Sequence, residues 1–161
     1  MTSSSKIVVS EQQKQRRVLA SERHKARHYA MQAIYQWQMS STTAHDIEAQ
    51  FRADFGMKGV DIDYFRELVK AVQMQSEQFD FLLAPHAVDK VLSECDPVTL
   101  SLLRIATFEL EQRIDVPYRV VIDEAVKLAK KFGPEDSHSF VNAVLDKLAR
   151  QLRVTETNAQ R

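Results

Sequence analysis

The sequence predicts a single all-α domain, a helical bundle of about seven helices, and three observations support this. Glycine and proline are scarce, with 3 and 4 among 161 residues, so long helices can run uninterrupted. Apolar residues recur with helical spacing in several segments, whereas the two-residue alternation of a strand is absent. The contents of 44% hydrophobic and 27% charged residues are those of an ordinary globular domain.

The N-terminal part of the chain divides into a polar arm and a first helix. Residues 1–20 lack a sustained apolar stripe, so we predict a mobile arm there. Ser21 can cap a helix, and an apolar stripe with helical spacing follows it. The first helix is predicted over about 22–39, with a core stripe formed by Ala26, Ala30, Ala33, Ile34 and Trp37.

Three further helices are predicted in the middle of the chain. One fits residues 44–55 and ends close to Gly56. A longer helix fits 61–83 with Asp61 as its cap, and a short helix fits 86–94. The inward side of the longer helix is formed by Phe65, Leu68, Val69, Val72, Phe79 and Leu82.

The next two helices differ in their apolar pattern. The segment from Pro97 to about Arg113 is apolar on all sides, which is typical of a helix at the centre of a bundle. The helix after it has its ends written into the sequence, because it begins at Pro117 and stops at Gly133. Its buried face is formed by Val121, Ala125, Leu128, Ala129 and Phe132.

A final helix, capped by Asp136 or Ser137, is predicted to run to about Leu152. Its apolar residues again recur at helical spacing. The globular domain therefore comprises residues 21–153, and we predict a disordered tail over 154–161.

Composition excludes several classes of protein. No apolar run approaches the roughly 18 residues that a membrane span requires, and the N-terminus lacks the apolar core of a signal peptide. We therefore expect a cytoplasmic protein. Cys95 is the only cysteine, which excludes an internal disulfide and a thiolate zinc cluster.

The net charge of zero hides an asymmetry along the chain. Seven Lys/Arg against two Glu give residues 1–28 a net charge of +5, and the remainder carries −5. A basic end on an acidic body indicates a polyanionic partner at one place, or else a solubilising tail. Charge alone leaves both readings open.

No catalytic or metal-binding constellation stands out, so we predict a protein that is not an enzyme and needs no cofactor. The three glycines cannot form a phosphate-binding loop. His24 and His28 are four residues apart, but the arginines and lysine around them would repel a metal cation. Asp136, Ser137 and His138 are the residue types of a hydrolase triad, yet they are adjacent in sequence, where helix capping explains them better.

One face of the first helix is a better candidate for function. His24, His28, Met31 and Tyr35 follow one another on this face, about a third of a turn from the core stripe. An exposed tyrosine beside cations suits single-stranded RNA, although Tyr35 can equally pack against a neighbouring helix. Arg104 lies in the apolar central helix, where an ion pair with Asp or Glu is the default expectation.

A set of short motifs occurs in a characteristic order. Each is weak alone, but their order and spacing resemble the NusB family from about Arg23 to about Leu148. The motifs are Arg23, Lys25 and Arg27 followed by Ala33-Ile34-Tyr35-Gln36-Trp37, then Asp63-Tyr64-Phe65, Leu103-Arg104-Ile105-Ala106, Glu109-Leu110, Asp115-Val116-Pro117-Tyr118, and the stretch from Ile122-Asp123-Glu124-Ala125 to Asp146.

The resemblance implies an all-helical RNA-binding factor of bacterial transcription. Such proteins pair with NusE, a small-subunit ribosomal protein, and bind boxA RNA. With other Nus factors and RNA polymerase they suppress termination, chiefly in ribosomal RNA operons. Carried over by motif, the RNA-binding positions are Arg23, Lys25, Arg27 and Tyr35, with Arg104 near the same surface and His24 where an arginine is common, and the partner-binding positions are Asp136 and His138.

The chain departs from the family pattern at several positions. Asp123 stands where Asn is frequent and Ala143 where Gly is frequent, and the charged residues common around Thr99 are missing. Two alternative functions stay open. The chain could be a fragment of a ribosomal RNA methyltransferase that carries a NusB-like module, or a self-associating bundle whose homodimer covers the RNA face.

Overall fold

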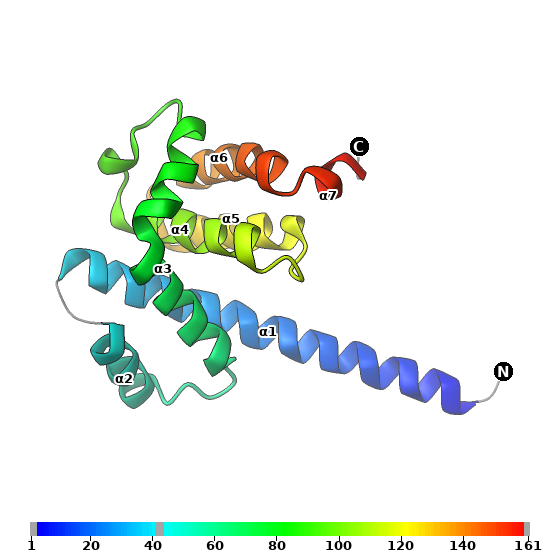
Figure 1. Cartoon of the computed structure of the whole chain (residues 1–161). Helices are drawn as coiled ribbons and strands as arrows, with labels where there is room; N and C mark the ends of the chain where they lie inside the picture. Colours follow the sequence, from blue (N-terminus) through cyan, green and yellow to red (C-terminus); the bar gives the residue numbers. More distant parts are fainter. Residues whose placement is uncertain (1–2, 41–43, 160–161) are drawn as a thin grey trace.

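The computed structural model describes residues 3–40 and 44–159 of the chain. Helices form nearly all of this part, and it contains no strand, which confirms the prediction of an all-α fold (Figure 1). The seven α-helices of the described part are α1 Ser3–Met39, α2 Ala44–Phe55, α3 Ile62–Leu83, α4 Pro97–Gln112, α5 Tyr118–Phe132, α6 Ser137–Leu152 and α7 Val154–Ala159. No helix in these residues is long and apolar enough to cross a membrane.

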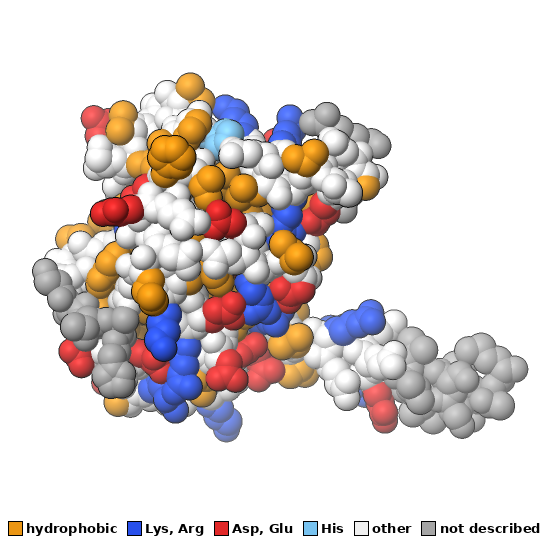
Figure 2. All heavy atoms as spheres, in the orientation of Figure 1, with side chains coloured by type: hydrophobic (Ala, Val, Ile, Leu, Met, Phe, Trp, Pro, Cys, Tyr) orange, Lys and Arg blue, Asp and Glu red, His pale blue; other side chains and the backbone are white. Residues whose placement is uncertain are grey.

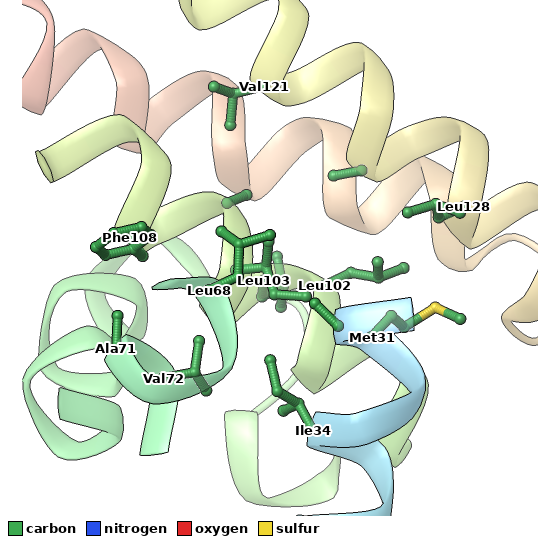
Figure 3. Packing of buried hydrophobic residues seen from close by; sticks show 14 of the residues in the cluster. Met31, Ile34, Leu68, Ala71, Val72, Leu102, Leu103, Phe108, Val121 and Leu128 are labelled. Carbon is green, nitrogen blue, oxygen red and sulfur yellow. The ribbon is translucent and has the colours of Figure 1, made fainter. Parts of the chain in front are cut away.

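Helix α4 lies at the centre of the bundle, as its all-round apolar pattern predicts. It packs against α1, α3, α5 and α6, and its Leu102 and Leu103 are buried among their side chains (Figure 3). Two buried hydroxyl residues of α4 turn back on their own helix. The hydroxyl of Ser101 donates to the Pro97 carbonyl at 2.6 Å, and that of Thr107 to the Leu103 carbonyl at 2.7 Å. The core therefore accepts these two hydroxyls with their hydrogen bonds satisfied, whereas the buried hydroxyl of Thr99 has no hydrogen-bond partner in the described part of the chain.

Helix α1 is much longer than predicted, because it begins at Ser3 and not near residue 22. Ser21 lies inside the helix and caps nothing. Without proline or glycine, nothing in the sequence stops the helix before Met39. The described side chains of residues 10–21 are exposed, and this part of α1 projects from the bundle (Figure 1). Its mobility stays a prediction, and residues 1–2 lie outside the described part.

The middle of the chain confirms two predicted helices and corrects a third. Helix α2 has the predicted bounds, and Asp61 caps α3 by accepting the Tyr64 backbone N–H at 3.1 Å. The helix predicted over 86–94 is wrong. Two single turns stand there instead, η1 at Ala84–His86 and η2 at Leu92–Glu94. Valines in this connection are exposed, so it lacks the buried apolar face that would stabilise a longer helix.

The connection between α5 and α6 is tight. A Cβ atom at Gly133 would lie 2.4 Å from the Ser137 hydroxyl and 2.8 Å from the Ala129 carbonyl, so only glycine fits. Asp136 precedes α6 in the left-handed conformation, with φ of 67°, and its side chain makes no capping hydrogen bond. Asp136 therefore occupies the predicted N-cap position, but its backbone carbonyl and not its side chain accepts a hydrogen bond there, from the Ser139 N–H at 3.2 Å.

The predicted disordered tail is ordered over residues 154–159, where it forms α7; residues 160–161 lie outside the described part. Buried Arg153 holds this end of the chain. Its guanidinium donates to the carboxylate of Glu156, at 2.6 Å, and Glu156 also accepts the Tyr118 backbone N–H at 2.9 Å. Four backbone carbonyls in the last turn of α4 and in the connection to α5 accept further hydrogen bonds from Arg153, those of Glu109, Leu110, Arg113 and Val116.

We predict that Arg153→Met lowers the free energy of unfolding by at least about 3 kcal/mol, because several buried carbonyls lose their only side-chain donor. Arg150→Met is the matched control, since Arg150 is exposed and pairs only with Asp146 one turn earlier on α6. Its effect should stay within about 0.5 kcal/mol. Urea denaturation measures both, and equal effects of the two substitutions would contradict the anchoring role.

Candidate functional site

The predicted functional face of α1 contains one clearly exposed aromatic residue. Tyr35 is 40% exposed, and beside it lies an apolar hollow of about 200 Å³ between α1, α4 and α5. Met31, which we predicted on the surface with Tyr35, is buried and forms the floor of this hollow. The remaining lining residues are Gln32, Val98 and Phe132. Tyr35 and the hollow together offer a flat ring and an apolar recess of the kind that accommodates an unstacked base.

His28 extends this aromatic surface toward the N-terminus of α1. Its ring stacks on Phe132, with centroids 4.7 Å apart, and hydrogen-bonds Gln32 at 2.8 Å. Burial, helped by the charge of Lys131, holds the pKa of His28 below its usual value. His28 is therefore neutral at pH 7 and acts as an aromatic group there. Sequence reasoning missed Phe132 because its spacing assigned it to the core face of α5.

His24 is paired with a carboxylate and is not a free cation. Its Nδ1 contacts Glu124 of α5, and the side chain is half-exposed. Lys25, the next residue, is exposed, and within the described residues it forms no ion pair. Its ammonium group lies against the loop at Gly59. Of the predicted basic residues Arg23, Lys25 and Arg27, Lys25 is therefore the one that no carboxylate in the described part of the chain neutralises.

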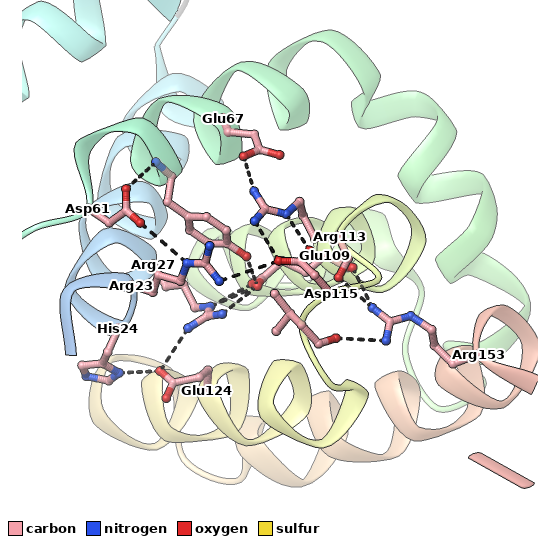
Figure 4. A network of polar contacts seen from close by, with 12 residues as sticks. Arg23, His24, Arg27, Asp61, Glu67, Glu109, Arg113, Asp115, Glu124 and Arg153 are labelled. Atoms are coloured by element: carbon pink, nitrogen blue, oxygen red, sulfur yellow. Dashed lines mark hydrogen bonds and ion pairs between the residues drawn. The ribbon is translucent and has the colours of Figure 1, made fainter. Parts of the chain in front are cut away.

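Arg23 lies at the edge of a polar network and Arg27 at its centre (Figure 4). Arg23 is partly buried, 3.6 Å from Asp61, and its guanidinium stacks over the Tyr64 ring at 4.6 Å. Arg27 is only 4% exposed and contacts Glu109 of α4 through two nitrogens, the shorter hydrogen bond being 2.8 Å. Arg27 is therefore buried and does not lie on a surface that could face RNA.

The pairing of Arg27 with Glu109 is tight. The hydroxyl of Tyr64 donates to the same Glu109 carboxylate at 2.5 Å, which joins α1, α3 and α4. Burial opposes the charge on Arg27, but the hydrogen bond and the charge of Glu109 outweigh it and raise the pKa of Arg27. Burial, followed by the charge of Glu109, raises the pKa of Tyr64 as well. Arg27 therefore stays protonated and the Tyr64 hydroxyl keeps its proton across the neutral range.

Arg104 forms the ion pair that its position in α4 predicts. Two of its nitrogens donate to Asp80 of α3 at 2.9 and 2.7 Å, and a third donates to the Gln38 side chain at 2.9 Å. Gln38 lies on α1, one turn after Tyr35. Arg104 therefore fixes the end of α1 and lines a second hollow, of about 600 Å³, with Trp37 and Leu100.

The two predicted partner-binding residues lie near each other at the junction of α5 and α6. Asp136 is exposed and lines a hollow of about 370 Å³, whereas His138 is partly buried in the first turn of α6 and does not line it. The half-buried ring of Phe140 contributes an apolar wall to this hollow. Sequence reasoning missed Phe140 because it read the stretch around it as packing.

Two departures from the family pattern lie on the surface. Ala143, which stands where Gly is frequent, is exposed and lines the hollow at Asp136, so it does not lie at a close helix contact. Asp123 is exposed in a polar hollow of about 290 Å³ with Arg119 and Arg150. In the described part of the chain, no three His, Cys, Asp or Glu side chains are grouped so that they could hold a metal ion.

Comparisons with known proteins place these features in one family. The model of the NusB family matches residues 24–150. The transcription antitermination protein NusB of Teredinibacter turnerae is 57% identical over 145 residues, which are 90% of this chain and 99% of that protein. Its counterpart in Saccharophagus degradans is 50% identical over 145 residues, 90% of this chain and 97% of that protein. The solved structure of T. maritima NusB superposes with a TM-score of 0.69 at 26% identity, covering 80% of this chain and 90% of that one.

The Arg27–Glu109 pair predicts a specific pattern of stability. Arg27→Met should lower the free energy of unfolding by about 3–5 kcal/mol, because it leaves the Glu109 carboxylate buried without its cation. The double variant Arg27→Met, Glu109→Gln should recover more than half of that loss, since no buried charge remains.

Lys25→Met, two residues away and exposed, is the control for this pair and should change stability by less than about 0.5 kcal/mol. Thermal and urea unfolding of the four proteins measure the effects. A double variant less stable than Arg27→Met alone would contradict the pairing.

Proposed function

The chain belongs to the NusB family of transcription antitermination proteins, and from that premise we propose that it pairs with NusE and binds boxA RNA to suppress termination. The ribosomal RNA operons are the chief targets in this proposal, and the bacterial cytoplasm is the place of action. Other Nus factors and RNA polymerase join through the complex. The family is non-enzymatic, which confirms the prediction that the chain is not an enzyme.

The observation that carries the RNA-binding proposal is the exposed ring of Tyr35 beside an apolar hollow. An aromatic ring that is exposed next to an apolar recess, as that of Tyr35 is, is suited to stacking an unpaired base. Lys25 lies on the same helix and supplies charge for phosphates, and the half-exposed ring of His24 borders it. The neutral His28 lies between them and Tyr35 and continues the aromatic surface.

The buried arginines have a different role in this proposal. Arg27 and Arg104 are held by Glu109 and Asp80, and a phosphate contact would require breaking those pairs. They support RNA binding by fixing α1 against α3 and α4. Arg23 is intermediate, because one side of its guanidinium is occupied by Asp61 and the Tyr64 ring while part of it stays accessible.

The proposed NusE contact lies at the junction of α5 and α6, only a few residues beyond Phe132 of the Tyr35 hollow. Asp136 offers an unpaired carboxylate there, since no ion pair to it exists within the described residues, and Phe140 offers an apolar wall. An aromatic anchor beside a charge at the rim is the usual composition of a binding hot spot. His138 borders this surface from the first turn of α6.

We predict that Tyr35→Ala weakens the binding of boxA RNA about ten-fold or more, because a stacked base contributes about 1–3 kcal/mol. Tyr35→Phe keeps the ring and should bind within about two-fold of the unaltered protein. Fluorescence anisotropy with labelled boxA RNA, with and without NusE, measures both. Equal binding by the alanine variant and the unaltered protein would refute the assigned face.

For the partner surface, we predict that Phe140→Ala reduces the affinity for NusE at least ten-fold, since it removes an apolar wall at the centre of the contact. The folded state should survive because Phe140 is only half-buried. Val120→Ala, an exposed apolar residue on α5 outside the hollow, is the control and should bind normally. Calorimetric titration of NusE distinguishes the two, and unchanged affinity in Phe140→Ala would exclude this surface.

A further inference from the structure

The projecting part of α1 lies outside the region that the family model matches. That model begins at residue 24, whereas α1 begins at Ser3. The segment Ser3–Ser21 therefore adds about 28 Å of helix at about 1.5 Å per residue. We call this segment the arm. Its described side chains, from residue 10 onward, are exposed, so the bundle core does not require it.

The arm continues the face of α1 that carries Tyr35. Arg17 precedes Tyr35 by 18 residues, which is about five helical turns, so both side chains leave the helix in the same direction. Ser21, His24 and His28 occupy the same face between them at steps of three and four residues. The distance from Arg17 to Tyr35 along the axis is about 27 Å.

The arm carries cations that the protein itself does not neutralise. Lys14, Arg16 and Arg17 are exposed, and in the described part of the chain none of them forms an ion pair. The arginines nearer the bundle are different, because Arg23 and Arg27 are already engaged by carboxylates. Figure 2 shows Lys and Arg side chains on the projecting helix, away from the acidic groups of the body, together with an acidic side chain of the helix itself. The arm can therefore offer its charge to a polyanion without breaking an internal pair.

Over residues 10–21, the apolar residues of the arm do not suit a membrane or a second helix. Val18 and Leu19 are exposed, but they are neighbours in sequence and leave the helix about 100° apart. Between residues 10 and 21 no further apolar side chain follows either of them at a spacing of three or four. A membrane-surface helix or a coiled-coil seam needs such a continuous stripe. Over residues 10–21, the arm therefore presents charge and not a continuous apolar stripe.

We propose that RNA bound at Tyr35 continues along α1 toward its N-terminus, and that Arg17 and Lys14 of the arm bind its phosphates. This inference rests on the proposed function, because the same RNA must occupy both parts of the face. Arg17 is aligned with Tyr35, and Lys14 lies one turn beyond it and about 60° around the helix. Arg16 points about 100° away from Arg17, off the shared face.

The test compares two neighbouring arginines that differ in direction alone. Arg17→Gln and Arg16→Gln remove the same charge from the same exposed helix. Two RNAs serve as probes, one limited to boxA and one that carries boxA with single-stranded flanks on both sides. Binding is measured by anisotropy over a series of salt concentrations, with Tyr35→Ala as the reference for the part of the face that the proposed function assigns to RNA.

On the flanked RNA, Arg17→Gln should reduce the slope of log affinity against log salt by about 0.7, which is about a five-fold loss at 0.1 M salt. Arg16→Gln should leave both the slope and the affinity close to those of the unaltered protein. On the short RNA, neither arginine variant should have an effect. Thermal unfolding should be the same for all, because the arm is exposed.

Equal losses in Arg16→Gln and Arg17→Gln, or no loss in either, would overturn the inference while normal sensitivity to Tyr35→Ala keeps the proposed function. Absence of RNA binding by the unaltered protein and NusE together would overturn both. Vesicles containing phosphatidylserine are the third probe in the experiment. If Arg17→Gln weakens vesicle binding but leaves the flanked RNA unaffected, the arm serves a membrane surface and the inference is wrong.

Discussion

The buried contact of Arg27 and Tyr64 with the Glu109 carboxylate is the constraint on which the rest of the structure depends. It joins three helices at one point and fixes both the rotation and the height of α1 against α3 and α4. A slip of one residue along α1 would turn Arg27 by about 100° and leave a buried charge without its partner. Because α1 carries Tyr35 and His28, this contact also determines where the candidate RNA-binding face points.

Local signals in the sequence predict most helix ends, but they do not predict the pairing of distant residues. Asp61, Pro117 and Gly133 mark ends that the structure confirms, because caps and breakers act within one turn. The partner of Arg27 lies 82 residues away, and no local pattern identifies it. For the same reason, the family resemblance placed Arg27 among the RNA-binding cations, whereas the structure buries it in the core.

Both ends of the globular domain differ from the sequence-based boundaries for physical reasons. The arm is helical although it has no apolar stripe, and periodicity cannot detect a helix that buries nothing. At the other end, α7 is held by Arg153 through backbone carbonyls, acceptors that every residue type provides. In the candidate site, too, the sequence revealed only what depends on local spacing. Exposed Tyr35 was found from its position on the helix. Phe132 lines the Tyr35 hollow and Phe140 lines the Asp136 hollow, but the local pattern assigned both residues to packing.

The continuity of α1 affects how tightly the protein can bind an RNA strand that reaches both Tyr35 and the arm. One unbroken helix sets a fixed separation between the tyrosine and the arm, so a strand captured at one point faces the other at a high effective concentration. Two individually weak attachments then act with the avidity of a bidentate ligand, without any motion of the protein. The same rigidity selects by length, because a strand too short to span the separation receives none of this gain.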